Sequence, residues 1–94
     1  MSKENEIRGY LKSFQEEVKR RKEVLRCGIE GVADEYDIKY GLLLEGQTKP
    51  KFSGEMALHH LKGIQIYEKC VEKLQNCLDN YLLSKECTLA HDTQ

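Results

Sequence analysis

A basic run at Lys19–Lys22 is the segment whose residue types point most directly to chemistry with a charged ligand. The run reads Lys-Arg-Arg-Lys, and Arg26 follows it. Clustered Lys and Arg side chains bind phosphates, so the run suggests a site for nucleotides, nucleic acid or an acidic partner. On a helix, however, consecutive side chains point about 100° apart and cannot form one patch. Because Glu16 and Glu17 stand four positions before the two arginines, we expect most of the run to be a solvated helix face.

Three of these basic residues and two tyrosines form an alternative ligand site that we retain. The candidates for contact with phosphate or an acidic partner are Lys19, Lys22 and Arg26, and we expect Lys22 and Arg26 to be unpaired. The candidates for stacking on a base are Tyr10 and Tyr36, since aromatic side chains stack on nucleobases. We expect such a site to form at a junction between subunits.

The sequence has no pattern that points to catalysis or metal binding. His59 and His60 are adjacent, and neither has another His or Cys at the spacing that places two ligands on one helix face. The glycines fit neither a dinucleotide-binding turn nor a phosphate-binding loop. No Ser or Cys stands in a recognisable arrangement with a base and a third group. We therefore expect no enzyme activity, no catalytic residue, no metal and no cofactor.

The middle of the chain carries leucines where a connection between helices is usually polar. Gly, Pro and polar residues dominate about 41–54, which indicates a connector. Its apolar residues are candidates for binding a partner: Leu42, Leu43, Leu44 and Phe52. Two interpretations are open: these side chains cover the open end of a helical bundle, or they dock another protein.

Two segments with helical periodicity flank the connector. In the first, about residues 2–40, apolar residues recur at steps of three, four or seven: Ile7, Leu11, Phe14, Val18, Leu25 and Val32. In the second, about 54–83, the same spacing appears at Ala57, Leu61, Ile64, Tyr67, Val71, Leu74, Leu78 and Tyr81. This spacing predicts two helices, each with a coiled-coil seam. Gly28 and Gly31 interrupt the first, so we expect it to kink, break or meet another backbone closely near residues 28–31.

These elements predict an all-α fold, an antiparallel hairpin of two long helices. The domain is expected to span 1–83, followed by a flexible tail at 84–94, and the sequence leaves open whether residues 28–46 are helix, kink or loop. Both apolar stripes are wider than a two-helix seam requires. We therefore expect a homo-oligomer, a dimer or larger, that completes a four-helix bundle by self-association.

Length and composition agree with this small interaction domain. The chain has 94 residues and a net charge of −1, which removes the simple electrostatic argument for binding nucleic acid or membranes. It has no apolar run long enough to span a bilayer and no apolar leader at its start. The four cysteines are Cys27, Cys70, Cys77 and Cys87. We expect them reduced and buried, in a cytoplasmic protein.

The function expected from the sequence is therefore binding rather than catalysis. The leading hypothesis is a small cytoplasmic protein that self-associates and acts through protein–protein interaction, as an adaptor, chaperone or inhibitor. The alternative is an oligomer that binds nucleotides or nucleic acid through Lys19, Lys22 and Arg26, with tyrosine stacking. A membrane partner is not expected.

Overall fold

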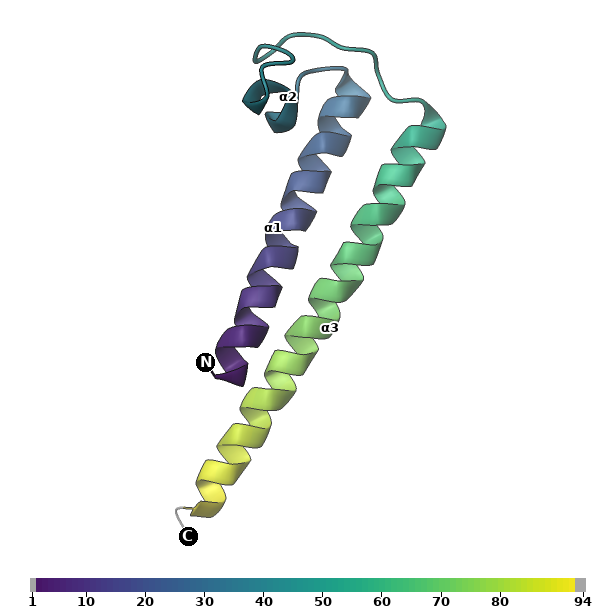
Figure 1. The fold of residues 1–94 in the computed structure, drawn as a ribbon. Coiled ribbons are helices and arrows are strands. Elements are labelled where there is room, and N and C mark those ends of the chain that lie inside the picture. Colours follow the sequence, from purple (N-terminus) through teal and green to yellow (C-terminus); the bar gives the residue numbers. More distant parts are fainter. Residues whose placement is uncertain (1, 93–94) are drawn as a thin grey trace.

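Two long antiparallel helices lie side by side and are joined at one end by a folded connector (Figure 1). The structure is a computed structural model that describes the backbone of residues 2–92 and the side chains of residues 2–85. Helix α1 spans Lys3–Glu30, α2 spans Glu35–Lys39 and α3 spans Gly54–Asp92. Because α1 packs along α3, the predicted all-α helical hairpin is confirmed.

The core is a single seam between α1 and α3. Ile7 and Leu11 of α1 are buried against Leu78 of α3. Nearer the connector, Cys27 and Ile64 are each 2% exposed. Full burial of an Ile or Leu side chain contributes roughly 1.5–3 kcal/mol, so this seam holds the hairpin together.

Helix α1 begins and ends at residues whose types explain the boundary. The N–H of Asn5 donates to Oγ of Ser2 at 3.2 Å, which caps the first turn. The helix ends at Glu30 because Gly31 adopts a left-handed conformation with φ of 76°, and its N–H donates to the carbonyl of Cys27 at 2.8 Å. The expected break at 28–31 is confirmed, and the first helix does not continue to residue 40.

Gly28 lies inside α1, two residues before its end, where the connector crosses the helix in close contact. A Cβ atom at Gly28 would lie 2.1 Å from the ring of Phe52. The N–H of Phe52 donates to the Gly28 carbonyl at 2.9 Å, and its ring stacks on His60 with 4.8 Å between centroids. Phe52 therefore fastens the connector to both helices.

Helix α3 is longer than the sequence pattern suggested. It begins after Ser53, whose Oγ accepts from the N–H of Met56 at 3.2 Å, and it passes through Gly63 without interruption. It continues to Asp92, beyond residue 83, where we expected the second helix to give way to a tail. Residues 93 and 94 of that expected tail lie outside the described residues.

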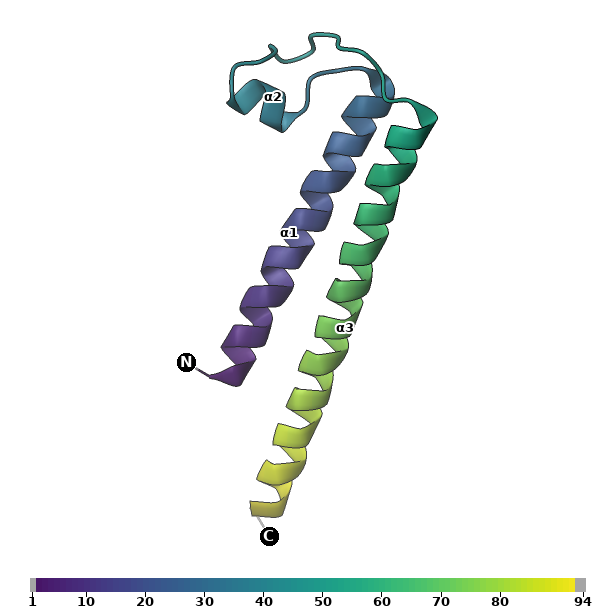
Figure 2. The ribbon, with the colours of Figure 1, turned by 45° about the vertical axis from the view of Figure 1, so that its right-hand side comes forward.

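The hairpin is elongated and one helix layer thick (Figure 2), with extents of 65 × 26 × 15 Å. Its radius of gyration is 19.3 Å, against about 12 Å for a compact domain of this length. Within the described part of the chain, no helix combines the length and the apolar character needed to span a bilayer.

Replacement of Gly28 tests the close contact with Phe52. We expect Gly28→Ala to lower the free energy of unfolding by about 1–3 kcal/mol, because the new methyl group overlaps the ring. Gly9→Ala is the matched control: it lies in the same helix with nothing within 4 Å of its Cβ, so it should stabilise by up to about 1 kcal/mol. Urea denaturation followed by circular dichroism measures both, and equal effects would contradict the packing described.

Candidate functional site

The connector, residues 31–53, is folded against the end of the hairpin. Val32 and Thr48 form an antiparallel bridge between its two arms. Beside this bridge, the N–H of Ala33 donates to the carbonyl of Gln47 at 2.9 Å. The two arms are therefore paired through their backbones, and the segment between them has a defined conformation.

A buried cluster of three charged side chains holds the arms together. Nζ of Lys49 lies 2.9 Å from Oδ2 of Asp34 and 2.5 Å from Oδ2 of Asp37. The side chains of Lys49, Asp34 and Asp37 are 17%, 7% and 13% exposed. Charged groups are buried at little net cost only when they are paired and hydrogen-bonded, as these are. We call these three residues the polar anchor.

The polar anchor also forms the start of α2. The N–H of Asp37 donates to Oδ1 of Asp34 at 3.0 Å, and the N–H of Asp34 donates to Oδ2 of Asp37 at 3.1 Å, which makes a capping box. A five-residue helix is not stable in isolation. Since no residue of α2 is buried, capping and the ion pairs with Lys49 hold it in place.

Both partners of the closest ion pair are shifted toward their charged forms. The hydrogen bond from Lys49, together with the backbone N–H of Asp34, lowers the pKa of Asp37. Burial alone would lower the pKa of Lys49, but its hydrogen bonds to Asp37 and Asp34 outweigh burial and raise it. The anchor therefore favours the folded connector at neutral pH.

The apolar side chains of the same segment point into solvent. Five large ones, between 42% and 77% exposed, lie within nine consecutive residues: Tyr36, Ile38, Tyr40, Leu42 and Leu44. We call this set the connector surface. The connector thus covers the charges of the polar anchor and exposes these five apolar side chains, whereas folded domains usually bury large apolar groups.

Backbone hydrogen bonds hold the leucines in place although they are exposed. The N–H groups of Leu42 and Leu43 donate to the carbonyl of Asp37 at 2.8 and 3.3 Å. The N–H of Leu44 donates to Oε1 of Gln47 at 2.9 Å. Leu43 is half-buried, whereas Leu42 is 62% and Leu44 77% exposed. In the single hairpin, these two leucines present a fixed apolar surface.

Phe52 differs from the leucines with which the sequence grouped it. Its ring is half-buried between Gly28 and His60, as described above. Because Phe52 packs within the fold, it is not part of the candidate docking surface. That surface consists of the leucines and the aromatic and aliphatic residues of α2.

Two of the three basic candidates already have acidic partners, which corrects our expectation that they are unpaired. Arg26 forms ion pairs with Glu23 and, at 2.7 Å, with Glu30. Lys22 lies 3.8 Å from Glu68 across the seam. Their charge is therefore matched within the chain, and this lowers their attraction for phosphate.

The neighbouring arginines share one carboxylate. Arg20 and Arg21 contact Glu17 at 2.6 and 2.8 Å, so Arg20 uses Glu17 and not the expected Glu16. Arg21 also lies over the ring of Tyr67, 4.5 Å from its centroid. The expected pairing is confirmed for both side chains, and Arg20 is exposed as expected, whereas Arg21 is half-buried against Tyr67.

The structure does not gather the two stacking candidates and the three basic candidates into one site. Tyr36 lines a cleft of about 280 Å³ between α2 and α1, together with Arg20, Glu23, Val24, Glu35, Lys39 and Tyr40. Lys19 lines an adjoining hollow that shares Arg20, Glu23 and Glu35 with this cleft, whereas Lys22 and Arg26 line neither of the two. Tyr10 is 54% exposed and lies nine residues before Lys19, about 13 Å along α1. Within one chain, these residues do not form a common nucleotide site.

The thiols differ in burial, which corrects the expectation that all are buried. Cys27 is buried, and burial followed by its hydrogen bond to Glu23 raises the pKa of its thiol. Cys70 is half-buried and Cys77 is exposed, and all three are free. The side chain of Cys87 lies outside the described residues.

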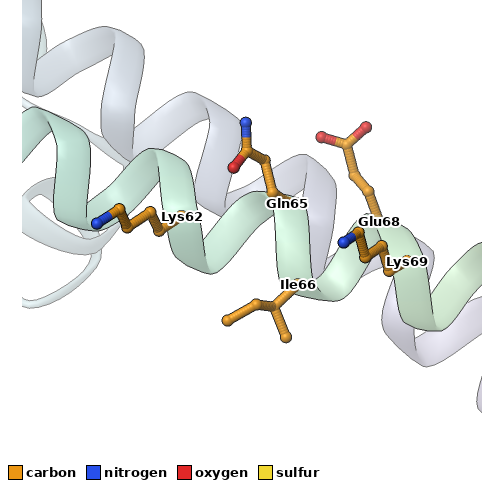
Figure 3. Close-up of a pocket in the computed structure, with 5 residues that line it drawn as sticks. All are labelled: Lys62, Gln65, Ile66, Glu68 and Lys69. Carbon is orange, nitrogen blue, oxygen red and sulfur yellow. The ribbon is translucent and has the colours of Figure 1, made fainter.

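Among the described residues, no group of three or more His, Cys, Asp or Glu side chains could hold a metal ion. A hollow on α3 is lined by Lys62, Gln65, Ile66, Glu68 and Lys69 (Figure 3). These side chains spread outward from one helix, so the hollow is an open surface and does not enclose a substrate.

The polar anchor was missed by sequence analysis, although one signal for part of it was present. Asp34 and Asp37 have the three-residue spacing of a capping box, which marks a helix start. Lys49 lies 15 residues from Asp34, and no local pattern connects them.

Comparisons with models of protein families, with curated proteins and with solved structures find no match to this chain. Evidence about the function of the chain therefore comes from its own geometry.

Removal of the lysine tests the polar anchor. We expect Lys49→Met to lower the free energy of unfolding by about 1–3 kcal/mol, because it leaves the buried carboxylate of Asp34 without its cation. Lys12→Met, at an exposed position of α1, is the control and should change stability by less than about 0.5 kcal/mol. Urea denaturation measures both; indistinguishable effects would rule out an anchoring role.

Acid should weaken the polar anchor and so lower the free energy of unfolding. The pKa of Asp37 is lowered in the folded protein, so its contribution is present above the unfolded value of about 3.9 and is lost as pH falls below it. Wild type should lose stability relative to Asp37→Asn between about pH 5 and pH 2. Denaturation at a series of pH values measures this difference, and a difference independent of pH would refute the assignment.

Proposed function

We propose that this protein is a small, non-enzymatic, cytoplasmic binding protein that acts through protein–protein interaction, as an adaptor, chaperone or inhibitor. The observation that carries the proposal is the connector, which buries charge and exposes the five apolar side chains of the connector surface. Exposed apolar groups gathered in one segment are typical of surfaces that bind another protein.

The energetics of the connector favour binding. Each large apolar side chain that a partner covers contributes up to roughly 1.5–3 kcal/mol. Since backbone hydrogen bonds and the polar anchor already order the segment, less conformational entropy is lost on association. We infer that the partner offers a complementary apolar surface, with tyrosines of the connector surface near its centre.

We also propose that the hairpin works as a homo-oligomer, with a four-helix bundle as the simplest form. This proposal is supported by the single layer of helices and by uncharged side chains of α3 that stay exposed beside the seam, such as Met56 and Cys77. Two hairpins packed together would cover surface that one hairpin leaves in water.

Binding of nucleotides or nucleic acid has less support. The matched charges of Lys22 and Arg26 weaken the case for a phosphate site. A salt series separates the two functions: affinity for nucleic acid falls steeply as salt rises, whereas apolar docking changes little.

A pair of matched variants tests the connector surface. Leu44→Asp places a charge at its most exposed leucine, and Leu83→Asp places the same charge at the distant end of the hairpin, where Leu83 is 60% exposed. A protein partner captured from host extract by wild type should be retained by Leu83→Asp and bind Leu44→Asp about tenfold or more weakly. Equal binding by both variants, with helicity unchanged, would overturn the proposed docking surface.

A further inference from the structure

A stripe of uncharged residues runs along α3 beside the seam with α1. Its six central positions recur at steps of three and four, so they share one helix face: His60, Gly63, Tyr67, Cys70, Leu74 and Cys77. The same spacing reaches Met56 and Tyr81, again without charge. We call the six central residues the α3 stripe. A helix face that carries no charged side chain over this length is typical of a surface that loses its water on association.

The α3 stripe is only partly covered by the hairpin itself. Tyr67 contacts the ring of Phe14, with 5.7 Å between centroids, and the guanidinium of Arg21 lies 4.5 Å from the Tyr67 centroid. His60 stacks on Phe52, and Leu74 packs against the core. Yet all members except Cys77 are half-buried, and Cys77 is exposed. Side chains of α1 and of the connector therefore cover the stripe in part, and the rest of it is open to solvent, most of all at Cys77.

The area of the chain indicates what can cover it. The hairpin exposes 7383 Å², about 1,800 Å² more than the roughly 5,600 Å² of a compact monomer of its mass of 10.9 kDa. A stable dimer needs about 800 Å² from each partner. The excess can therefore supply a dimer interface and leave the connector surface free.

If a second copy of the chain covers the α3 stripe, the order of residue sizes along the stripe favours one direction and one register. Bulky and small residues alternate along the α3 stripe, and two antiparallel copies centred between Glu68 and Lys69 pair each bulky residue with a small one. The opposed pairs are His60 with Cys77, Gly63 with Leu74 and Tyr67 with Cys70, each partner coming from the other copy. Bulky residues opposite small ones give close interdigitation between helices.

We propose that two copies of this chain associate through the α3 stripe, antiparallel and about a two-fold axis at residues 68–69. This inference rests on the self-association proposed above and adds the face, the direction and the register. A two-fold interface uses the same patch on both subunits. The α3 stripe meets this requirement because its positions are spaced symmetrically about its centre.

Cross-linking of single cysteines tests the direction and register. With a rise of 1.5 Å per residue, the two Cys70 residues are offset by about 4.5 Å along the axis, and the two Cys77 residues by about 26 Å. One variant keeps Cys70 by carrying Cys27→Ala, Cys77→Ser and Cys87→Ser. Its matched control keeps Cys77 and carries Cys70→Ser instead of Cys77→Ser.

A short bismaleimide should link the Cys70 chain into a covalent dimer and leave the Cys77 chain monomeric. Comparable cross-linking of both chains would indicate a parallel pair, and cross-linking of Cys77 alone would indicate another register; either overturns the inference. Absence of any link, while sedimentation shows a dimer, also overturns it and leaves self-association standing.

Charge placed in the stripe tests the face. Wild type should sediment at about 22 kDa, twice the chain mass of 10.9 kDa, at tens of micromolar. Cys70→Arg should raise the dimer dissociation constant by about tenfold or more, because it buries an unpaired charge. Asn76→Arg, at an exposed position of α3 outside the stripe, should leave it unchanged.

The outcomes distinguish this inference from the function on which it rests. A wild-type particle of 10.9 kDa would overturn both the self-association and the α3 interface. A wild-type dimer that persists in Cys70→Arg, or that is lost in Asn76→Arg, would overturn the interface alone. Circular dichroism confirms that each variant keeps its helicity, so that a change in mass reports association.

Discussion

The contact of Lys49 with Asp34 and Asp37 is the constraint on which the connector depends. Helix α2 is too short to form alone and buries none of its residues, so apolar packing does not hold it. Instead, two carboxylates and one ammonium group satisfy each other inside the segment. Because polar groups hold α2 in place, the apolar side chains of the connector surface remain exposed. The same interaction therefore explains both why the connector is folded and why it exposes apolar residues.

The two proposed interfaces lie on separate parts of the hairpin. The connector surface is at one end, where α2 stands on the side of α1 away from α3 (Figures 1 and 2). The α3 stripe runs along the length of the other long helix. Association of two copies through α3 would set two connector surfaces in one particle at its opposite ends, since the copies are antiparallel. Such a dimer could bind two partner molecules, and simultaneous binding at both ends would increase the avidity for a multivalent partner.

The helices were predictable from sequence because local spacing determines them. The apolar residues of the seam, such as Leu11 and Leu78, follow a helical repeat, and Gly28 and Gly31 marked the break correctly. The connector was not predictable in the same way, since the pairing of Lys49 with Asp34 joins residues 15 positions apart and depends on where α1 ends. The pairing of Lys22 with Glu68 across the seam likewise required the register of the two helices. The candidate leucines were found, but the exposure of α2 around them became visible only in the structure.

Amide hydrogen exchange of wild type at neutral pH tests most directly the claim that the connector is folded before any partner binds. The informative amides are those of Ala33 and Phe52, which donate to the carbonyls of Gln47 and Gly28. We predict that both amides exchange far more slowly in the isolated protein than in an unstructured chain, although the apolar residues of the connector surface are still exposed. Exchange of these two amides at the rate of an unstructured peptide, while the amides of α1 remain protected, would contradict it.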